Sequence, residues 1–160
     1  MAKNKEEKTN VMRTLEQKKI PYTAHSYDPE GPIDGVSVAQ TLGQPPERVF
    51  KTLVTKGASG AYYVFDIPVA ENLDLKKAAR AVGEKSIAML PQKELLGLTG
   101  YVHGGCSPVG MKKQFPTVFH ETAAEYDTIC VSAGKIGYQV ECDPKALLTL
   151  LRAGTADIIV

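Results

Sequence analysis

Apolar residues recur along this chain at two spacings, one typical of helices and one typical of strands. Spacings of three and four residues predict helices over residues 9–19, 36–42, 74–82, 91–96 and 144–152. Alternating or β-branched runs predict strands over residues 22–27, 49–55, 61–68, 86–90, 99–103, 116–120, 128–132 and 138–142. Strands outnumber helices and are joined largely by hairpins. The pattern therefore predicts an α+β fold, with a curved, mainly antiparallel mixed sheet or barrel and surrounding helices.

Length and charge limit what such a fold can do. The chain has 160 residues, 43% of them apolar, and no internal repeat, so residues 1–160 are expected to form a single domain. The net charge of +1 lacks the broad basic excess of a sequence-independent nucleic-acid binder, and any nucleic-acid contact should be local. No apolar run approaches the roughly 20 residues that span a bilayer. We therefore expect a cytoplasmic protein without membrane contact.

The cysteines and histidines indicate neither a disulfide framework nor a metal site. Cys106, Cys130 and Cys142 are odd in number and contain no Cys-x-x-Cys pair, as expected of free thiols. The three histidines stand far apart without tight ligand spacing, which disfavours a zinc site. We therefore expect no cofactor and no metal.

A lysine interrupts the otherwise apolar and β-branched strand predicted over residues 49–55. Strand alternation places Lys51 on one face with Val49 and Leu53, and Phe50 on the other. One interpretation is that the ammonium points to solvent from a half-exposed strand. The other is that it projects into a pocket, where it binds an anion or a carbonyl oxygen.

The stretch from His103 to Lys113 reads HGGCSPVGMKK. Its glycines and its Ser-Pro step predict a loop whose backbone turns sharply and approaches a ligand closely. The glycine spacing fits neither a P-loop nor a dinucleotide fingerprint. Ser107 lacks the Gly-x-Ser-x-Gly context of a nucleophilic serine, and Cys106 has no assigned base besides the neighbouring His103. Backbone N–H groups are then the more plausible actors, and they would polarise a carbonyl or hold a carboxylate or phosphate.

Four segments together carry a resemblance to a known family. They read VFKTLV at 49–54, LDLKKAA at 73–79, GYVHGGCSPVG at 100–110 and VSAGKIG at 131–137. With these motifs in order over nearly its whole length, the chain resembles the bacterial YbaK (EbsC) proteins. These are free-standing editing domains related to the insertion domain of prolyl-tRNA synthetase. The resemblance implies hydrolysis of a mischarged aminoacyl-tRNA, typically Cys-tRNA(Pro), in trans beside prolyl-tRNA synthetase.

The resemblance also implies the residues of the site. Lys51 matches the family's central lysine, expected at the tRNA 3′ end or the ester, and joins Gly105 and Ser107 of the glycine loop as the expected catalytic set. The expected substrate-binding residues are Tyr27, Phe50, Thr52, Gly104, Pro108 and Ser132. In the Cys-specific branch of the family, the substrate thiol attacks its own ester carbonyl and releases a cyclic thioester. The protein would then supply positioning and oxyanion stabilisation rather than a nucleophile.

Some points stay open at the level of sequence. Gln139 stands where some members of the family carry an acidic residue, and we treat His103 and Cys106 as spectators or tuners of pocket shape. One alternative is the same chemistry on Ala-tRNA(Pro) or another small aminoacyl-tRNA. A second is a non-catalytic module that binds tRNA or a synthetase. The expected partners are mischarged tRNA(Pro) and prolyl-tRNA synthetase, and the expected state is a monomer or weak homodimer.

Overall fold

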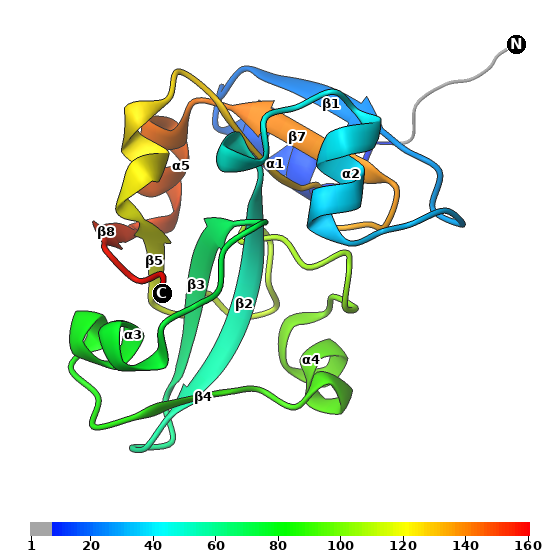
Figure 1. The fold of residues 1–160 in the computed structure, drawn as a ribbon. Helices are drawn as coiled ribbons and strands as arrows, with labels where there is room; N and C mark the ends of the chain where they lie inside the picture. Colours follow the sequence, from blue (N-terminus) through cyan, green and yellow to red (C-terminus); the bar gives the residue numbers. More distant parts are fainter. Residues whose placement is uncertain (1–7) are drawn as a thin grey trace, which may run out of the picture.

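The structure is a computed structural model that describes residues 8–160, and Figure 1 shows its fold. The α-helices of these residues are α1 (Asn10–Gln17), α2 (Gly35–Thr41), α3 (Leu75–Val82), α4 (Gln92–Thr99) and α5 (Pro144–Leu151). Two 3-10 helices accompany them, η1 (Pro46–Arg48) and η2 (Glu121–Glu125). The strands are β1 (Tyr22–Ser26), β2 (Phe50–Gly57), β3 (Tyr62–Pro68), β4 (Ile87–Met89), β5 (Thr117–His120), β6 (Ile129–Ser132), β7 (Tyr138–Cys142) and β8 (Gly154–Ala156).

The strands are arranged in two sheets. A small antiparallel sheet has the order β1-β7-β6, and a large mixed sheet has the order β4-β2-β3-β5-β8, with parallel pairs on both sides of β5. The predicted α+β class is confirmed, and the predicted hairpin of β2 and β3 lies inside the large sheet. The alternative of a barrel is wrong for the described residues. Their two sheets are joined by an isolated bridge between Val49 and Cys130, which is too short to close a barrel.

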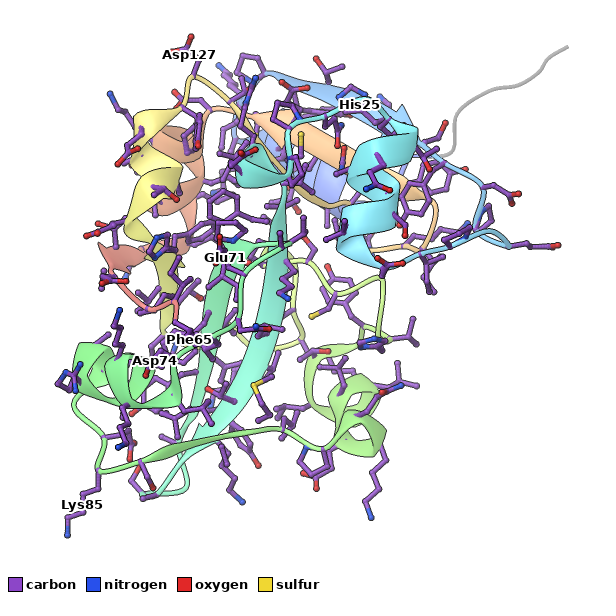
Figure 2. All side chains as sticks on the ribbon, in the orientation of Figure 1. His25, Phe65, Glu71, Asp74, Lys85 and Asp127 are labelled. Atoms are coloured by element: carbon purple, nitrogen blue, oxygen red, sulfur yellow. The ribbon has the colours of Figure 1, made fainter. Side chains whose placement is uncertain are left out.

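The hydrophobic core is shared between the sheets and the helices that cover them. Phe65 of β3 packs with Ala78 and Ala79 of α3, and Figure 2 shows its label between the sheet and that helix. Phe50 and Phe119 of the large sheet lie with ring centroids 6.2 Å apart in a cluster that includes residues of the small sheet. Burial of these aromatic rings therefore fixes the large sheet against the small one.

Local sequence signals explain most of the element boundaries. Thr9 caps α1 by accepting a hydrogen bond from the Met12 N–H (3.2 Å), and Asp143 caps α5 by accepting one from the Lys145 N–H (2.8 Å). Pro144 occupies the first position of α5, where its missing N–H leaves no helical bond unmade. Both caps are of the residue types preferred at helix N-termini.

One predicted strand is wrong. Residues 99–103 do not form a strand, because α4 continues beyond the predicted 96 to Thr99 and ends at Gly100, whose φ is +87°. The Thr99 hydroxyl donates to the Leu95 carbonyl and accepts from the Tyr101 N–H, so it binds to the last turn of the helix. The short strand β8 was not predicted; it pairs in parallel with β5.

No helix among residues 8–160 has the length and apolar character needed to cross a membrane.

Candidate functional site

A cavity of about 440 Å³ opens where the first half of β2 meets the small sheet. Its wall includes the segment that leads into α2, the first half of β2, the glycine loop, and the adjoining ends of β6 and β7. Six residues expected in the site lie on this wall: Tyr27, Phe50, Lys51, Thr52, Gly104 and Ser132. Chain segments far apart in the sequence are thus brought together around one hollow.

Lys51 is the basic residue of this wall. Its side chain is half-buried and forms neither a hydrogen bond nor an ion pair with the residues that the structure describes. Burial lowers the pKa of Lys51, and the nearby carboxylate of Glu71 opposes this effect. Of the two interpretations of Lys51, its place on the cavity wall fits the one in which the ammonium serves a ligand.

The edge of β2 is open beside the cavity. β4 pairs with β2 only from Thr55 onward, and the Val54 carbonyl accepts the Leu90 N–H, so even-numbered residues of β2 direct their backbone polar groups away from β3. The N–H and C=O groups of Thr52 therefore point toward the unpaired edge. Thr52 is also one of the residues on the cavity wall.

The glycine loop contributes Gly104 to the wall, whereas Gly105, Ser107 and Pro108 are buried beneath it. The Gly105 N–H donates to the Val102 carbonyl (2.9 Å), and Ser107 Oγ accepts from the Val109 N–H (3.2 Å). The first bond uses the Gly105 N–H that would serve as an oxyanion donor, and Ser107, which accepts in the second, is buried away from the cavity wall. The structure therefore assigns Gly105 and Ser107 to the shape of the loop, and their direct catalytic role stays a prediction that this placement does not favour.

The glycines permit a close approach between two loops of the protein. A Cβ atom on Gly105 would lie 3.1 Å from the backbone N of Ile136 in the turn after β6, and one on Gly104 would lie 3.0 Å from Ile33 Cδ1. Gly104 also has a φ of +91°, which residues with a side chain rarely adopt. The glycine loop therefore packs closely against the turn after β6 and against Ile33, and Gly104 lies at the margin of the cavity.

Cys106 also lines the cavity, but its chemistry does not suit a nucleophile. Burial, and in second place the nearby Asp66, raise the pKa of Cys106 to about 12. The thiol is therefore protonated at neutral pH, and the thiolate needed for nucleophilic attack is scarce. His103 is exposed and lines the same cavity, as a residue that tunes pocket shape would.

Asp66 of β3 is a residue that the sequence did not single out. Its side chain is fully buried, and its Oδ1 lies 2.6 Å from Thr52 Oγ1 in a hydrogen bond across the β2–β3 pair. Burial raises the pKa of Asp66 to about 8, although the bond to Thr52 acts in the opposite direction. The available signal was an acidic residue inside the apolar run of residues 61–68.

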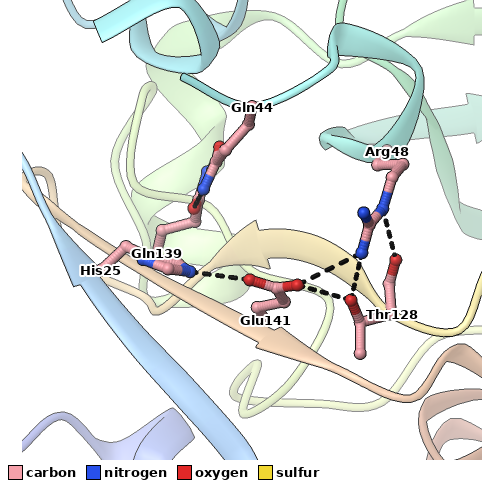
Figure 3. A network of polar contacts seen from close by, with 6 residues as sticks. All are labelled: His25, Gln44, Arg48, Thr128, Gln139 and Glu141. Atoms are coloured by element: carbon pink, nitrogen blue, oxygen red, sulfur yellow. Dashed lines mark hydrogen bonds and ion pairs between the residues drawn. The ribbon is translucent and has the colours of Figure 1, made fainter. Parts of the chain in front are cut away.

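Two groups of polar side chains brace the small sheet behind the cavity, as Figure 3 shows. Gln139, on the wall, is buried and exchanges hydrogen bonds with Gln44: Gln44 Nε2 donates at 2.6 Å, and Gln139 Nε2 donates back at 3.1 Å. Beside them, His25 Nε2 lies 2.8 Å from Glu141 Oε1, and Arg48 Nη2 lies 3.2 Å from Glu141 Oε2.

This network also contains the candidate metal ligands. Ligand atoms of His25, Cys130 and Glu141 lie within 4.8 Å of one another. However, both carboxylate oxygens of Glu141 already have partners, and the guanidinium of Arg48 brings a positive charge to the same place. A fixed cation disfavours a second one at this distance, so the arrangement is that of a structural brace.

Comparison with known proteins adds to this geometry. Residues 34–150 match the family model described as an aminoacyl-tRNA editing domain, so the match includes every wall residue named above except Tyr27 and Ile33. The chain is 49% identical over 160 residues, 99% of its length, to the Enterococcus faecalis (strain ATCC 700802 / V583) protein EbsC, a candidate Cys-tRNA(Pro)/Cys-tRNA(Cys) deacylase; the match covers 98% of EbsC.

Solved structures share the fold. One is a crystal structure of a candidate trans-editing enzyme for prolyl-tRNA synthetase, with a TM-score of 0.81, 28% identity and coverage of 94% of each chain. Another is the crystal structure of the hypothetical protein APE2540, with a TM-score of 0.85 and 20% identity over 94% of this chain and 99% of that one. The second likeness is evidence of the fold alone.

Proposed function

The chain belongs to the aminoacyl-tRNA editing domain family, and we propose that it is a trans-editing deacylase that hydrolyses Cys-tRNA(Pro). Membership makes it an aminoacyl-tRNA deacylase, with an aminoacyl-tRNA as substrate. What we propose beyond this is the identity of the tRNA, the identity of the amino acid that is removed, and the mechanism. We also propose that residues 1–160 form a single editing domain that acts beside prolyl-tRNA synthetase.

The observation that carries the proposal is the combination of an unpaired lysine with a protonated thiol on one cavity wall. Lys51 has no partner among the described residues, and an ammonium in that state suits the ester or a phosphate of the tRNA 3′ end. The pKa of Cys106 is raised to about 12, so this residue supplies little thiolate at neutral pH. The thiol of the cysteinyl group is then the proposed nucleophile.

In the proposed reaction the sulfur of the cysteinyl group attacks the carbonyl carbon of its own ester. A C–S bond forms and the C–O bond to the terminal ribose breaks, while the proton of the thiol ends on the ribose oxygen. The products are free tRNA and a cyclic thioester, which water opens to cysteine. In this proposal the ammonium of Lys51 and the open-edge N–H of Thr52 stabilise the charge that develops on the carbonyl oxygen, and their position at the cavity supports that role.

A panel of charged tRNAs tests this proposal. We expect Cys-tRNA(Pro) to be hydrolysed more than about 200-fold faster than Ser-tRNA(Pro) or Ala-tRNA(Pro). Pocket contacts alone separate such small substrates by about 10- to 200-fold, and the missing thiol adds to that difference. The measurement is the rate of deacylation, with Cys-tRNA(Cys) included to test how far the tRNA itself is selected.

Equal rates on all three amino acids would contradict the thiol mechanism and favour a general deacylase of small aminoacyl-tRNAs. Binding of charged tRNA without turnover would instead favour the non-catalytic module, and such binding would weaken steeply with added salt.

Substitution of Gly104 by alanine tests the margin of the cavity. The variant should lose about 1 kcal/mol of stability because of its positive φ, and kcat/KM should fall about tenfold or more because the added methyl group displaces Ile33 or the substrate. Gly60→Ala is the matched control, since Gly60 has a φ of +96°, lies outside the cavity wall, and has no atom within 4 Å of the position that a Cβ would take. Equal losses of activity in both variants would assign the effect to backbone strain alone.

A further inference from the structure

A buried carboxyl group lies directly behind the cavity wall. The Asp66 side chain has no exposed surface, its Oδ1 contacts Thr52 Oγ1 at 2.6 Å, and its Oδ2 has no partner among the described residues. None of the ion pairs within residues 8–160 includes it. A fully buried carboxylate without a cation is costly, and so this environment favours the neutral acid.

Thr52 links this carboxyl group to the cavity, because it contacts Asp66 and also lies on the cavity wall. Thr52 faces Asp66 directly in the register of β2 with β3, and it follows Lys51 on the cavity wall. The edge of β2 is unpaired at this position, because pairing with β4 begins at Thr55. Thr52 is therefore a wall residue whose backbone edge no strand within residues 8–160 covers.

The hydrogen-bond partners of the two Asp66 oxygens indicate which of them carries the proton of the neutral acid. With Asp66 as a carboxylate, Thr52 Oγ1 donates to Oδ1. In the neutral acid, a proton on Oδ2 would be a buried donor without an acceptor, whereas a proton on Oδ1 can be donated to Thr52 Oγ1, which reverses the bond and leaves only an unpaired carbonyl-type oxygen. Buried orphan donors are rarer than under-satisfied acceptors. The threonine oxygen then accepts from Asp66, and its own hydrogen is free to turn elsewhere.

We propose that Asp66 is a positioning residue of the deacylase: its neutral carboxyl donates to Thr52 and thereby directs the Thr52 hydroxyl hydrogen into the cavity, toward an oxygen of the aminoacyl ester. This inference rests on the proposed deacylase function. When Asp66 ionises, the carboxylate accepts the Thr52 hydrogen instead, and the donor is withdrawn from the substrate. Deprotonation of a residue that never touches the substrate thus removes a hydrogen bond in the site.

Other groups near Asp66 also titrate, and their effects on the pH dependence of the rate must be distinguished from that of Asp66. Cys106, on the glycine loop, is the group whose pKa responds to Asp66, and it is raised to about 12. Lys51 titrates on the same wall, and the neighbouring residue of β5 in register is the apolar Phe119. The substrate thiol ionises as well. A ratio of rates between two enzymes cancels the contributions of Lys51 and of the substrate thiol, and the burial that chiefly raises the pKa of Cys106 is common to both enzymes.

The experiment compares kcat/KM for Cys-tRNA(Pro) between the wild type and Asp66→Asn from pH 6 to 9.5. Asparagine keeps the shape and donates permanently from its amide to Thr52 Oγ1. With an Asp66 pKa of about 8, the ratio of wild type to variant should fall about tenfold between pH 7 and pH 9. In a Thr52→Val background the ratio should be constant with pH, because the hydroxyl that transmits the effect is gone.

A ratio that is independent of pH, or one that falls equally in the Thr52→Val background, would overturn the inference. A purely structural role of Asp66 would give the same pH dependence of the ratio with and without the Thr52 hydroxyl. If the wild type is active and the ratio is flat, only the role of Asp66 fails. If the wild type does not hydrolyse Cys-tRNA(Pro), the proposed function fails and this inference fails with it.

Discussion

Replacement of Lys51 by alanine is expected to lower kcat/KM for Cys-tRNA(Pro) by about 100- to 1,000-fold. The half-buried ammonium has no partner among the described residues, so its charge is free for the ester or a phosphate near it. If Lys51 acts on the developing oxyanion, the loss should fall mainly on kcat; if it acts on a phosphate, it should fall mainly on KM. Single-turnover deacylation at saturating and limiting substrate separates the two.

Lys56→Ala is the matched control for this experiment. Lys56 belongs to the same strand, but it is exposed and lies over the Tyr62 ring, 5.7 Å from the ring centroid and outside the cavity wall. Its removal should change kcat/KM less than about threefold. The Lys51 variant should remain folded, because removal of a half-buried, unpaired charge relieves a desolvation cost. Equal effects of the two substitutions would mean that Lys51 contributes only to the general positive charge of the protein and has no specific role in the site.

Sequence patterns predicted those parts of the fold that depend on local chemistry. The apolar spacing that predicted α3 is a local signal, and the structure confirms that helix. The caps at Thr9 and Asp143 are equally local, since each depends on one side chain and the helix turn beside it. The predicted strand over 99–103 failed because the end of α4 depends on Gly100 in a left-handed conformation, and a glycine in sequence does not reveal which conformation it adopts. Boundaries near glycine are therefore where pattern reasoning is weakest.

The candidate site shows the same division. The lysine inside an apolar strand was a local anomaly, and it led to a residue on the cavity wall. The sequence of the glycine loop predicted that its backbone approaches another group closely, but not which group. For Gly105 that group is the backbone of Ile136 in the same protein rather than a ligand. Asp66 could not be placed from sequence, because its role depends on the register that sets it opposite Thr52. Contacts across strands are non-local, and a single sequence does not specify them.

The buried carboxyl group also predicts how stability depends on pH. The pKa of Asp66 is about 8 in the folded protein, whereas an exposed aspartate titrates near 3.8. Between these values the folded protein holds a proton that the unfolded chain has lost, so the free energy of unfolding falls as the pH rises and levels off above about 8. At the rate of about 1.4 kcal/mol per pH unit, Asp66 should cost the protein about 3 kcal/mol between pH 5.5 and pH 8.

Urea unfolding of the wild type and of Asp66→Asn at these two pH values isolates this effect, because titration of all other groups is common to both proteins. The variant should gain about 3 kcal/mol relative to the wild type as the pH rises, since asparagine has no proton to lose. Asp127→Asn is the control: Asp127 is exposed, as Figure 2 shows, and should give the same difference from the wild type at both pH values. A constant difference for Asp66→Asn would mean that the carboxyl group is already ionised at pH 5.5. Thr52 would then always be its donor, and the open edge of β2 would have to act on the ester through Lys51 and backbone N–H groups alone.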